Sequence, residues 1–299
     1  MEFSATVILA GLILALLWLF SVKRRKYRLP PGPPGFFILL NCSFSETYGP
    51  VMTLYMGWQR TVVLVGYDAV KDALVDQADD FTGRMPVPFL FKATNGYGLV
   101  ISNGKRWSQL RRFTLTTLRD FGMGRKGMEE WIQEVSQHLR VHIRTFKGKP
   151  FDPQFVLSST ISNVICCLFF GERFSFEDKQ FLHLLTIMPK VTRFNSSPLG
   201  QMYNIFPWIM DHLPGYHQTI FGHVKEARDF IKREIQEHKE TLDPSSHRGY
   251  TDCFLIRINQ EKDNPSSEFN YDNLVSTVLN LFVAGTETTS YTLSSHCAD

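Results

Sequence analysis

The sequence predicts a mainly α-helical body with a small β-sheet, preceded by a single transmembrane helix. Three observations support this fold class: a long apolar run near the start, two short β-rich runs after it, and a succession of helix-period segments in the rest of the chain. Across 299 residues, 43% hydrophobic and 20% charged side chains suit one globular body with a substantial core.

The net charge and the cysteines argue against two other classes of protein. The formal net charge is only +3, without the basic excess typical of proteins that bind nucleic acid. The five cysteines are odd in number and form no CxxC pair. We expect no nucleic-acid partner, and we interpret Cys166 and Cys167, adjacent inside an apolar run, as reduced core residues.

Residues 1–22 are predicted to be a transmembrane signal anchor. The apolar run Phe3–Val22 has about 20 residues, the length that crosses a bilayer as a helix. A basic flank, Lys23–Lys26, follows it and marks the cytosolic side. A cleaved secretory signal is the alternative, but its basic flank would precede the apolar run, and no small-x-small cleavage site is evident.

Residues 23–34 are predicted to be a basic stop and a proline-rich hinge. The prolines of Leu29–Pro34 hold the chain extended as a semi-rigid spacer. The body, residues 35–299, follows the hinge and is expected on the cytoplasmic side of the membrane.

The body begins with a predicted hairpin and continues as helices. Val51–Met56 and Thr61–Val65 read as its two strands. Asp68 is expected to cap a helix over Ala69–Gln77. Ser158–Phe170 is apolar all round, as in a core helix. Two amphipathic surface helices are predicted from apolar side chains at three- and four-residue spacing: Met128, Trp131, Ile132, Val135, Leu139, Ile143 and Phe146 in one, and Ile220, Val224, Ala227, Ile231 and Ile235 in the other.

Surface loops and one ambiguous segment interrupt these helices. Asp243–Gly249 and Gln260–Ser267 are polar, contain proline, and read as loops. Leu199–His217 is rich in aromatic residues and is broken by Pro207 and Pro214, so it cannot be one long helix. It fits either an interfacial patch in the bilayer or a buried connector, and the sequence does not decide between them.

Common catalytic motifs are missing or lack their context. Gly122–Gly127 fits GxGxxG, but the preceding Gln109–Phe121 is basic and poor in strand-forming residues, so a dinucleotide site is disfavoured. The sequence contains no HExxH, GxSxG, P-loop or clustered His/Cys ligand set. The sequence therefore contains no motif that indicates hydrolase or zinc chemistry.

A long helix near the end carries an unusual hexapeptide. Tyr271–Leu293 is predicted to be helical, yet its middle reads Ala284-Gly285-Thr286-Glu287-Thr288-Thr289. Glycine is a poor helix former, and threonine hydroxyls can bond back to carbonyls and open the hydrogen-bond ladder. If this deformed turn is functional, Ala284 and Thr288 share a face with Leu281, and Glu287 lies beside them to line an apolar cavity. A solvated threonine patch is the alternative.

A second motif lies far away in the sequence. Trp107 and Arg111 are four residues apart, on one face of a predicted helix, where an indole N–H and a guanidinium can meet one carboxylate. An exposed aromatic–cation pair is the structural alternative for this WxxxR spacing.

Taken together, these features resemble microsomal cytochromes P450, and the resemblance covers nearly the whole chain. The chain looks closest to the family-two branch, which oxidises drugs and fatty acids. The motifs that carry the resemblance are the anchor with its basic stop, the PPGP hinge, Phe81-Thr82-Gly83-Arg84, the WxxxR helix continuing into Leu118–Gly122, the AGTETT helix, FGERF at Phe170–Phe174 and FPWIMDHLPG at Phe206–Gly215.

The resemblance implies the cytochrome P450 fold and a haem-dependent monooxygenase in the endoplasmic reticulum membrane. Such an enzyme uses dioxygen and electrons from an NADPH-dependent flavoprotein reductase to oxidise small hydrophobic substrates such as fatty acids, steroids or xenobiotics. An acidic reductase would face the basic residues Arg112, Arg119, Arg125 and Lys126, for which a merely solvated basic face is the alternative.

The resemblance also assigns roles to individual residues. It implies that Arg84, Trp107 and Arg111 hold the haem propionates, and that Thr288 and Glu287 relay protons. Ala284 and Gly285 would leave room over the iron. The substrate would be walled by apolar residues: Val87, Leu90, Val100, Ile101 and Phe282.

The chain departs from the family pattern in two places. Past the AGTETT helix, it lacks the glycine-flanked loop whose cysteine is the axial ligand, and Cys297 has no such loop around it. We therefore expect no metal ligand in this sequence, and a catalytically inactive, truncated, membrane-anchored isoform that cannot hold haem is the alternative function. The first helix of the body, expected between Leu40 and Tyr48, is predicted to be missing.

Overall fold

The computed structural model describes residues 29–33, 44–56, 59–123 and 126–298. The chain divides into two compact units, Met1–Phe81 and Thr82–Asp299. The predicted anchor, residues 1–22, and most of the predicted hinge lie outside the described residues. Each unit is considered by itself below.

The first unit is built around the predicted hairpin. Strands β1 (Val51–Met56) and β2 (Gln59–Leu64) pair antiparallel, with Val51 opposite Leu64. A short helix, α2 (Phe44–Tyr48), precedes the hairpin, within the stretch where the first helix of the body was expected to be missing. The hairpin prediction is confirmed, with β2 beginning two residues earlier than expected.

The helix after the hairpin begins earlier than predicted. Helix α3 spans Tyr67–Lys71 with Gly66 as its N-cap, and a π-helical turn, η1 (Asp72–Asp76), continues it into the 3-10 turn η2 (Ala78–Phe81). Asp68 therefore lies inside the first turn, and the prediction that it caps the helix is wrong. An acidic side chain there still interacts favourably with the positive end of the helix dipole.

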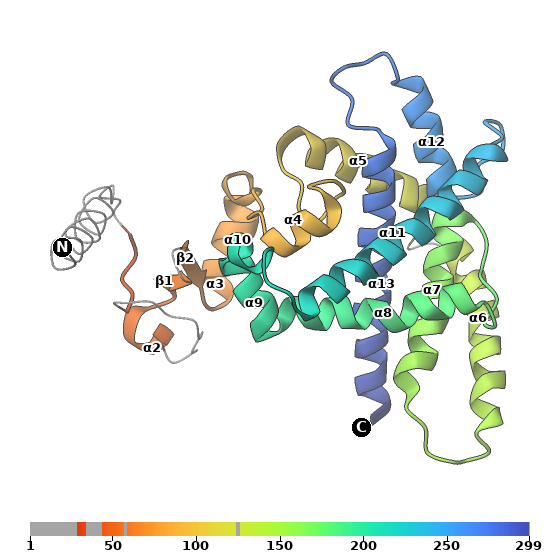
Figure 1. Ribbon diagram of the computed structural model, residues 1–299, viewed down its shortest axis with the longest axis horizontal. Coiled ribbons are helices and arrows are strands. Elements are labelled where there is room, and N and C mark those ends of the chain that lie inside the picture. Colours follow the sequence, from red (N-terminus) through yellow and green to blue (C-terminus); the bar gives the residue numbers. More distant parts are fainter. Residues whose placement is uncertain (1–28, 34–43, 57–58, 124–125, 299) are drawn as a thin grey trace, which may run out of the picture. The chain divides into compact units, whose positions relative to one another are not determined.

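The described residues of the second unit form helices joined by loops, without a strand, and Figure 1 labels these helices. Their bounds are α4 (Pro88–Thr94), α5 (Gly104–Asp120), α6 (Lys126–Thr145), α7 (Pro153–Phe170), α8 (Lys179–Ser196), α9 (Pro198–Ile205), α10 (Pro207–Met210), α11 (Tyr216–Glu240), α12 (Tyr250–Gln260) and α13 (Tyr271–Ala298). With the hairpin of the first unit, this confirms the predicted class of a mainly α protein with a small sheet.

Helix α7 is the core helix that the sequence predicted. Of the described helices, it alone has the length and hydropathy to cross a membrane, and its 18 residues are 56% buried inside the protein, as in a core helix. It begins at an N-cap, Asp152, whose side chain accepts from the backbone N–H of Gln154, and it ends at Gly171, which has the positive φ of 74° typical of a helix stop.

Helices α6 and α11 confirm the two amphipathic predictions to different degrees. All five apolar positions of α11 are buried: Ile220, Val224, Ala227, Ile231 and Ile235. On α6, Val135 is buried, but Ile132 and Ile143 are exposed. The apolar stripe of α6 is therefore only partly covered by the described residues.

The proline-broken segment forms two short helices, α9 and α10, separated at Phe206. Tyr203 and Met210 are buried in a second, smaller apolar cluster with Phe89 and Phe194. Trp208 and Leu213 are exposed instead. The buried-connector interpretation therefore holds for Tyr203 and Met210, and the interfacial-patch interpretation stays a prediction.

A buried ionic cluster joins the end of α11 to the start of α12. The Asp252 carboxylate, fully buried, accepts from His238 Nδ1 at 2.7 Å and from Arg248 Nε at 2.8 Å. Arg248 also donates to the His238 carbonyl oxygen at 3.1 Å. Burial alone would raise the pKa of Asp252, but the hydrogen bonds from His238 and Arg248 outweigh it and lower this pKa well below its ordinary 3.8.

We predict that Asp252→Asn destabilises the protein by about 3 kcal/mol at pH 7, because removing one partner leaves buried donors uncompensated. The depressed pKa means that the stabilisation is present above the unfolded value of 3.8 and is lost as the pH falls through the folded value. Urea unfolding of the full chain in detergent at pH 7 measures the first effect, and the decline of the free energy of unfolding down to pH 3 measures the onset of the second. Asp263→Asn, at an exposed loop position, is the control and should change the free energy of unfolding little; equal effects of the two variants would contradict the prediction.

Candidate functional site

The candidate site is organised by α13, which runs the length of the second unit in Figure 1. One side of α13 packs closely on α7. A β carbon on Gly285 would lie 2.9 Å from Ile165 Cδ1, and the Thr286 hydroxyl bonds that of Ser162 at 3.0 Å. The Ser290 hydroxyl accepts from Gln154 Nε2 at 3.2 Å.

The hexapeptide therefore divides between two faces of α13. Gly285, Thr286 and Ser290 face α7, whereas Ala284 and Thr288 are exposed on another side. The implied role of Gly285, leaving room over an iron, needs correction, because its missing side chain makes space for Ile165 of α7. Consecutive residues of a helix point about 100° apart, so Gly285 does not share the face of Ala284.

The helix is not opened at this point. Helix α13 is continuous through residues 284–289, so the predicted break in the hydrogen-bond ladder is absent. The predicted back-bond is present: the Thr288 hydroxyl donates to the Ala284 carbonyl oxygen at 2.7 Å. The Thr288 oxygen keeps lone pairs for a further donor.

Glu287 has a buried carboxyl group with one oxygen that lacks a hydrogen-bond partner among the described residues. Its side chain is 8% exposed, and its Oε2 is buried without a hydrogen-bond partner in the described part of the chain. Burial raises the pKa of this carboxyl, because the charged form loses hydration that nothing replaces. Of the titratable groups on α13, this one has the properties expected of a proton donor.

The WxxxR pair lies near the start of α5. Arg111 Cζ is 5.2 Å from the centre of the Trp107 ring, so the two side chains form the aromatic–cation pair named as the structural alternative. Arg84 is held next to the helix start by its backbone, since its N–H donates to Asn103 Oδ1 at 2.6 Å and its carbonyl accepts from Asn103 Nδ2 at 2.8 Å. Within the described residues, none of the three side chains has a hydrogen bond or ion pair.

Two asparagines that the sequence analysis did not consider connect this region to α13. Asn280 Oδ1 accepts from the backbone N–H groups of Leu99 and Val100 at 3.0 and 3.1 Å, and Asn273 Oδ1 accepts from that of Gly98 at 3.0 Å. Asn280 lies between the apolar pairs Val278–Leu279 and Leu281–Phe282, and that polar interruption was a usable signal, whereas Asn273 follows the polar Asp272. Asn280 lies about one turn before Ala284, and Val100 lies just before the start of α5.

The predicted substrate wall is brought together only in part. Phe282 is 3% exposed and belongs to the main core, since it points about 200° around α13 from Ala284; its assignment to the wall is corrected. Ile101 is also buried, at 8% exposed, so it too presents no open surface, because it lies where the loop is held against α13. Val87 and Leu90 are partly buried at α4, and Val100 is 43% exposed.

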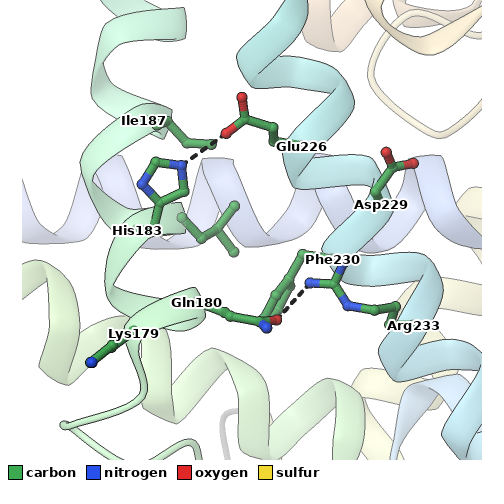
Figure 2. Close-up of a pocket in the computed structure, with 9 residues that line it drawn as sticks. Lys179, Gln180, His183, Ile187, Glu226, Asp229, Phe230 and Arg233 are labelled. Atoms are coloured by element: carbon green, nitrogen blue, oxygen red, sulfur yellow. Dashed lines mark hydrogen bonds and ion pairs between the residues drawn. The ribbon is translucent and has the colours of Figure 1, made fainter.

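Clefts elsewhere in the second unit do not involve the predicted site. One of about 430 Å³ lies between α8 and α11, where His183 pairs with Glu226 at 2.8 Å and Arg233 donates to Gln180 at 2.7 Å (Figure 2). Another of about 470 Å³ lies between α5 and α12 and includes Arg112. Figure 2 shows the His183–Glu226 ion pair and the Arg233–Gln180 hydrogen bond across the first cleft, and the second cleft contains the Arg257–Glu261 ion pair.

The donor groups suit the propionate groups of a haem, but the described cysteines do not suit its iron. The guanidinium groups of Arg84 and Arg111 and the Trp107 indole are suited to propionate carboxylates and have no competing hydrogen bonds among the described residues. Cys166 and Cys167 are buried in α7, and burial raises the pKa of both thiols and that of Cys253, the last to about 11. These three cysteines do not fit a thiolate ligand.

No group of three or more His, Cys, Asp or Glu side chains that could hold a metal ion occurs in the described ranges. Cys42 and the side chain of Cys297 lie outside them. The residues that can act on a cofactor here are therefore the propionate donors and the exposed face of α13.

Comparison with known proteins identifies the family of the chain. The sequence model of the cytochrome P450 family matches residues 38–297. Cytochrome P450 2C1 from Oryctolagus cuniculus is 45% identical over 96% of this chain and 62% of its own length. Cytochrome P450 2A9 from Mesocricetus auratus is 46% identical, and cytochrome P450 2A6 from Homo sapiens is 45% identical, each over 94% of this chain and 60% of its own length.

The chain thus spans about three fifths of the length of these relatives. The family match at residues 38–297 includes described parts of both units. It confirms the family-two resemblance inferred from the sequence. This chain belongs to the cytochrome P450 family.

Proposed function

We propose that the chain provides the α13 side of a haem-dependent monooxygenase site that acts on small hydrophobic substrates with dioxygen and NADPH-derived electrons. The observation that carries the proposal is the exposed Ala284–Thr288 face beside the buried, unpartnered carboxyl of Glu287. Through Asn280 and Val100, this face is connected to the helix that carries Trp107 and Arg111.

Haem, when bound, supplies the redox chemistry that activates dioxygen. The chain's own residues bind it and manage protons. Arg84, Trp107 and Arg111 hold the propionates by charge-assisted hydrogen bonds. Because its pKa is raised, Glu287 retains a proton closer to neutral pH than an exposed carboxyl does, and the Thr288 oxygen can accept from a water that passes this proton to the Ala284–Thr288 face.

Substrate contacts come from the apolar residues next to this face. Val100 is the most open of the predicted wall residues, and Val87 and Leu90 are partly buried at α4. An apolar wall with few polar groups accepts fatty acids, steroids or xenobiotics, and does not select among them.

Electrons would enter from an acidic flavoprotein reductase on the basic side of α5. Arg112 and Arg119 are exposed there and make no ion pair with the described residues. The other two predicted contacts, Arg125 and the side chain of Lys126, lie outside the described residues. Opposite charges on the two partners would speed their association.

We predict that Arg111→Ala weakens haemin binding by at least about tenfold, because a charge-assisted hydrogen bond to a propionate is lost. Arg112→Ala is the matched control on a neighbouring helix position: haemin affinity should stay unchanged, while binding to NADPH–cytochrome P450 reductase weakens. Absorbance titration of the full chain in detergent with haemin, and sedimentation with reductase, measure the two affinities. Equal haemin affinity in both variants, or no saturable binding at all, would count against the proposal.

The alternative is a catalytically inactive membrane protein of the same family. The buried cysteines with raised thiol pKa values favour it, since they cannot supply a thiolate.

The two functions differ in the spectrum of the reduced, carbon monoxide-treated membranes that carry the chain. The monooxygenase is expected to show the red-shifted Soret band of thiolate-ligated haem, and the inactive protein is not. Retained haemin without that band would rule out oxygenation by this chain.

We also propose attachment to the endoplasmic reticulum membrane, with the body on the cytoplasmic side. The apolar segment Phe3–Val22 supports it by its length. Exposed apolar side chains of the α9–α10 segment provide a second contact: Met202, Ile209, Leu213, Tyr216 and Trp208, the last 70% exposed. A cluster of this kind suits the interface between lipid headgroups and acyl chains.

We predict that lipid-borne quenchers reach Trp208. In phosphatidylcholine vesicles with brominated acyl chains, Trp208→Phe should reduce the quenchable tryptophan fluorescence. Trp131→Phe, at a partly buried position on α6, should not. An unchanged quenchable fraction in Trp208→Phe would exclude insertion of this segment, without bearing on the anchor.

A further inference from the structure

The cleft between α8 and α11 lies outside the proposed monooxygenase site (Figure 2). None of the residues that line it is among those assigned to haem, protons or substrate. Its two walls are joined twice, by Gln180 with Arg233 and by His183 with Glu226, so α8 and α11 run in opposite directions along it. Its volume of about 430 Å³ lies within the roughly 300 to 1,000 Å³ of pockets that take small ligands.

The floor of the cleft is apolar and fixed. It is formed by Leu184 and Ile187 of α8 and Phe230 of α11, each at most 5% exposed. All three belong to the main core of the second unit, so close packing from below holds them in place. The apolar part of a ligand can therefore cover this floor without a rearrangement of the protein.

One end of the cleft carries positive charge. Arg233 donates from Nη2 to Gln180 Oε1 at 2.7 Å, and its Cζ lies 5.8 Å from the centre of the Phe230 ring. These two contacts orient the guanidinium, yet it makes no ion pair with the described residues, and its other N–H groups remain for a ligand. Lys179, the residue before Gln180, adds a second positive charge to the lining. An oriented guanidinium of this kind suits a carboxylate.

The other end of the cleft carries carboxylates that already have partners. Glu226 accepts from His183 at 2.8 Å, and Asp229 pairs with Lys225 at 3.1 Å. Glu226 and Arg233 are seven positions apart on α11, which is roughly 10 Å along the helix. A ligand with a second negative charge would meet these carboxylates and be repelled. The charge pattern therefore selects one carboxylate at the Arg233 end and an uncharged body beyond it.

We propose that this cleft binds a small amphipathic monocarboxylate, with its carboxylate on Arg233 and its apolar part on Leu184 and Phe230. The inference does not depend on the proposed monooxygenase function, because the two sites share no residue. A ligand in the cleft contacts both helices, so its binding stabilises their pairing in proportion to its occupancy.

The choice of ligand tests which chemical groups the cleft recognises. The probe is 4-phenylbutyrate, which has one carboxylate and one aromatic ring, and saturation-transfer NMR titration of the full chain in nonionic detergent measures its affinity against protein-free micelles. We expect saturable binding by the parent protein. Binding of 4-phenylbutanol, which lacks the charge, and of acetate, which lacks the apolar body, should each be about tenfold weaker. Equal affinity for 4-phenylbutanol, or no saturable binding of 4-phenylbutyrate, would overturn the proposal.

Variants of the protein test where the probe binds. Arg233→Gln should weaken 4-phenylbutyrate binding by about tenfold through loss of the charge-assisted hydrogen bond, and Arg233→Lys, which keeps the charge, should retain most of the affinity. Lys239→Gln removes a positive charge from an exposed position of α11 outside the cleft, and is the matched control with the parent affinity. The weak affinity for 4-phenylbutanol should be the same in all of these proteins. Equal affinities of Arg233→Gln and Lys239→Gln for 4-phenylbutyrate would overturn this assignment of the cleft.

Discussion

The contact between α7 and α13 is the constraint on which the rest of the second unit depends. Helix α7 is apolar on most of its circumference, and the first half of α13 is largely apolar, so both must bury most of that surface. Gly285 lets Ile165 approach α13 closely, and hydroxyl pairs at Thr286 and Ser290 satisfy the polar groups along the seam. Because α7 covers this side of α13, the loop at residues 98–100 packs on another side. The face with Ala284 and Thr288 remains exposed.

The polar side chains of α13 are therefore of two kinds, those with hydrogen-bond partners and one without. Asn273 and Asn280 bond a neighbouring backbone, which makes them part of the scaffold. Glu287 has a buried oxygen for which the described residues offer no partner, and burial raises its pKa. An unsatisfied buried carboxyl costs stability, and such a cost is tolerated where a proton has to be held and released.

Near the C-terminal end of α11, another buried carboxylate has hydrogen-bond donors around it. The Asp252 carboxylate is as buried as any side chain on α13, but His238 and Arg248 surround it with donors and keep it ionised. Burial thus has opposite consequences for the two carboxyls, and the number of donors decides between them. The Asp252 cluster joins α11 to α12, whereas the buried Oε2 of Glu287 has no hydrogen-bond partner among the described residues.

The sequence alone determined the helices and strands whose signals are local. The period of apolar residues located α11, a segment that is apolar all round located the core helix α7, and two short β-rich runs located the hairpin. The motifs around Trp107, Arg111 and Ala284–Thr289 identified the family before any geometry was known. Asp68 was misplaced because Gly66, with its positive φ of 93°, already starts the helix, and a cap depends on backbone geometry that composition does not specify.

Only the tertiary structure decided which side of each apolar helix faces which neighbour. In the run Leu274–Val283 seven of ten side chains are apolar, so helical periodicity could not tell that Phe282 points into the core while Ala284 stays open. The space left by Gly285 belongs to Ile165, more than a hundred residues away in sequence, and the partners of Asn273 and Asn280 are equally distant. Such pairings follow from packing between elements, and no local pattern encodes them.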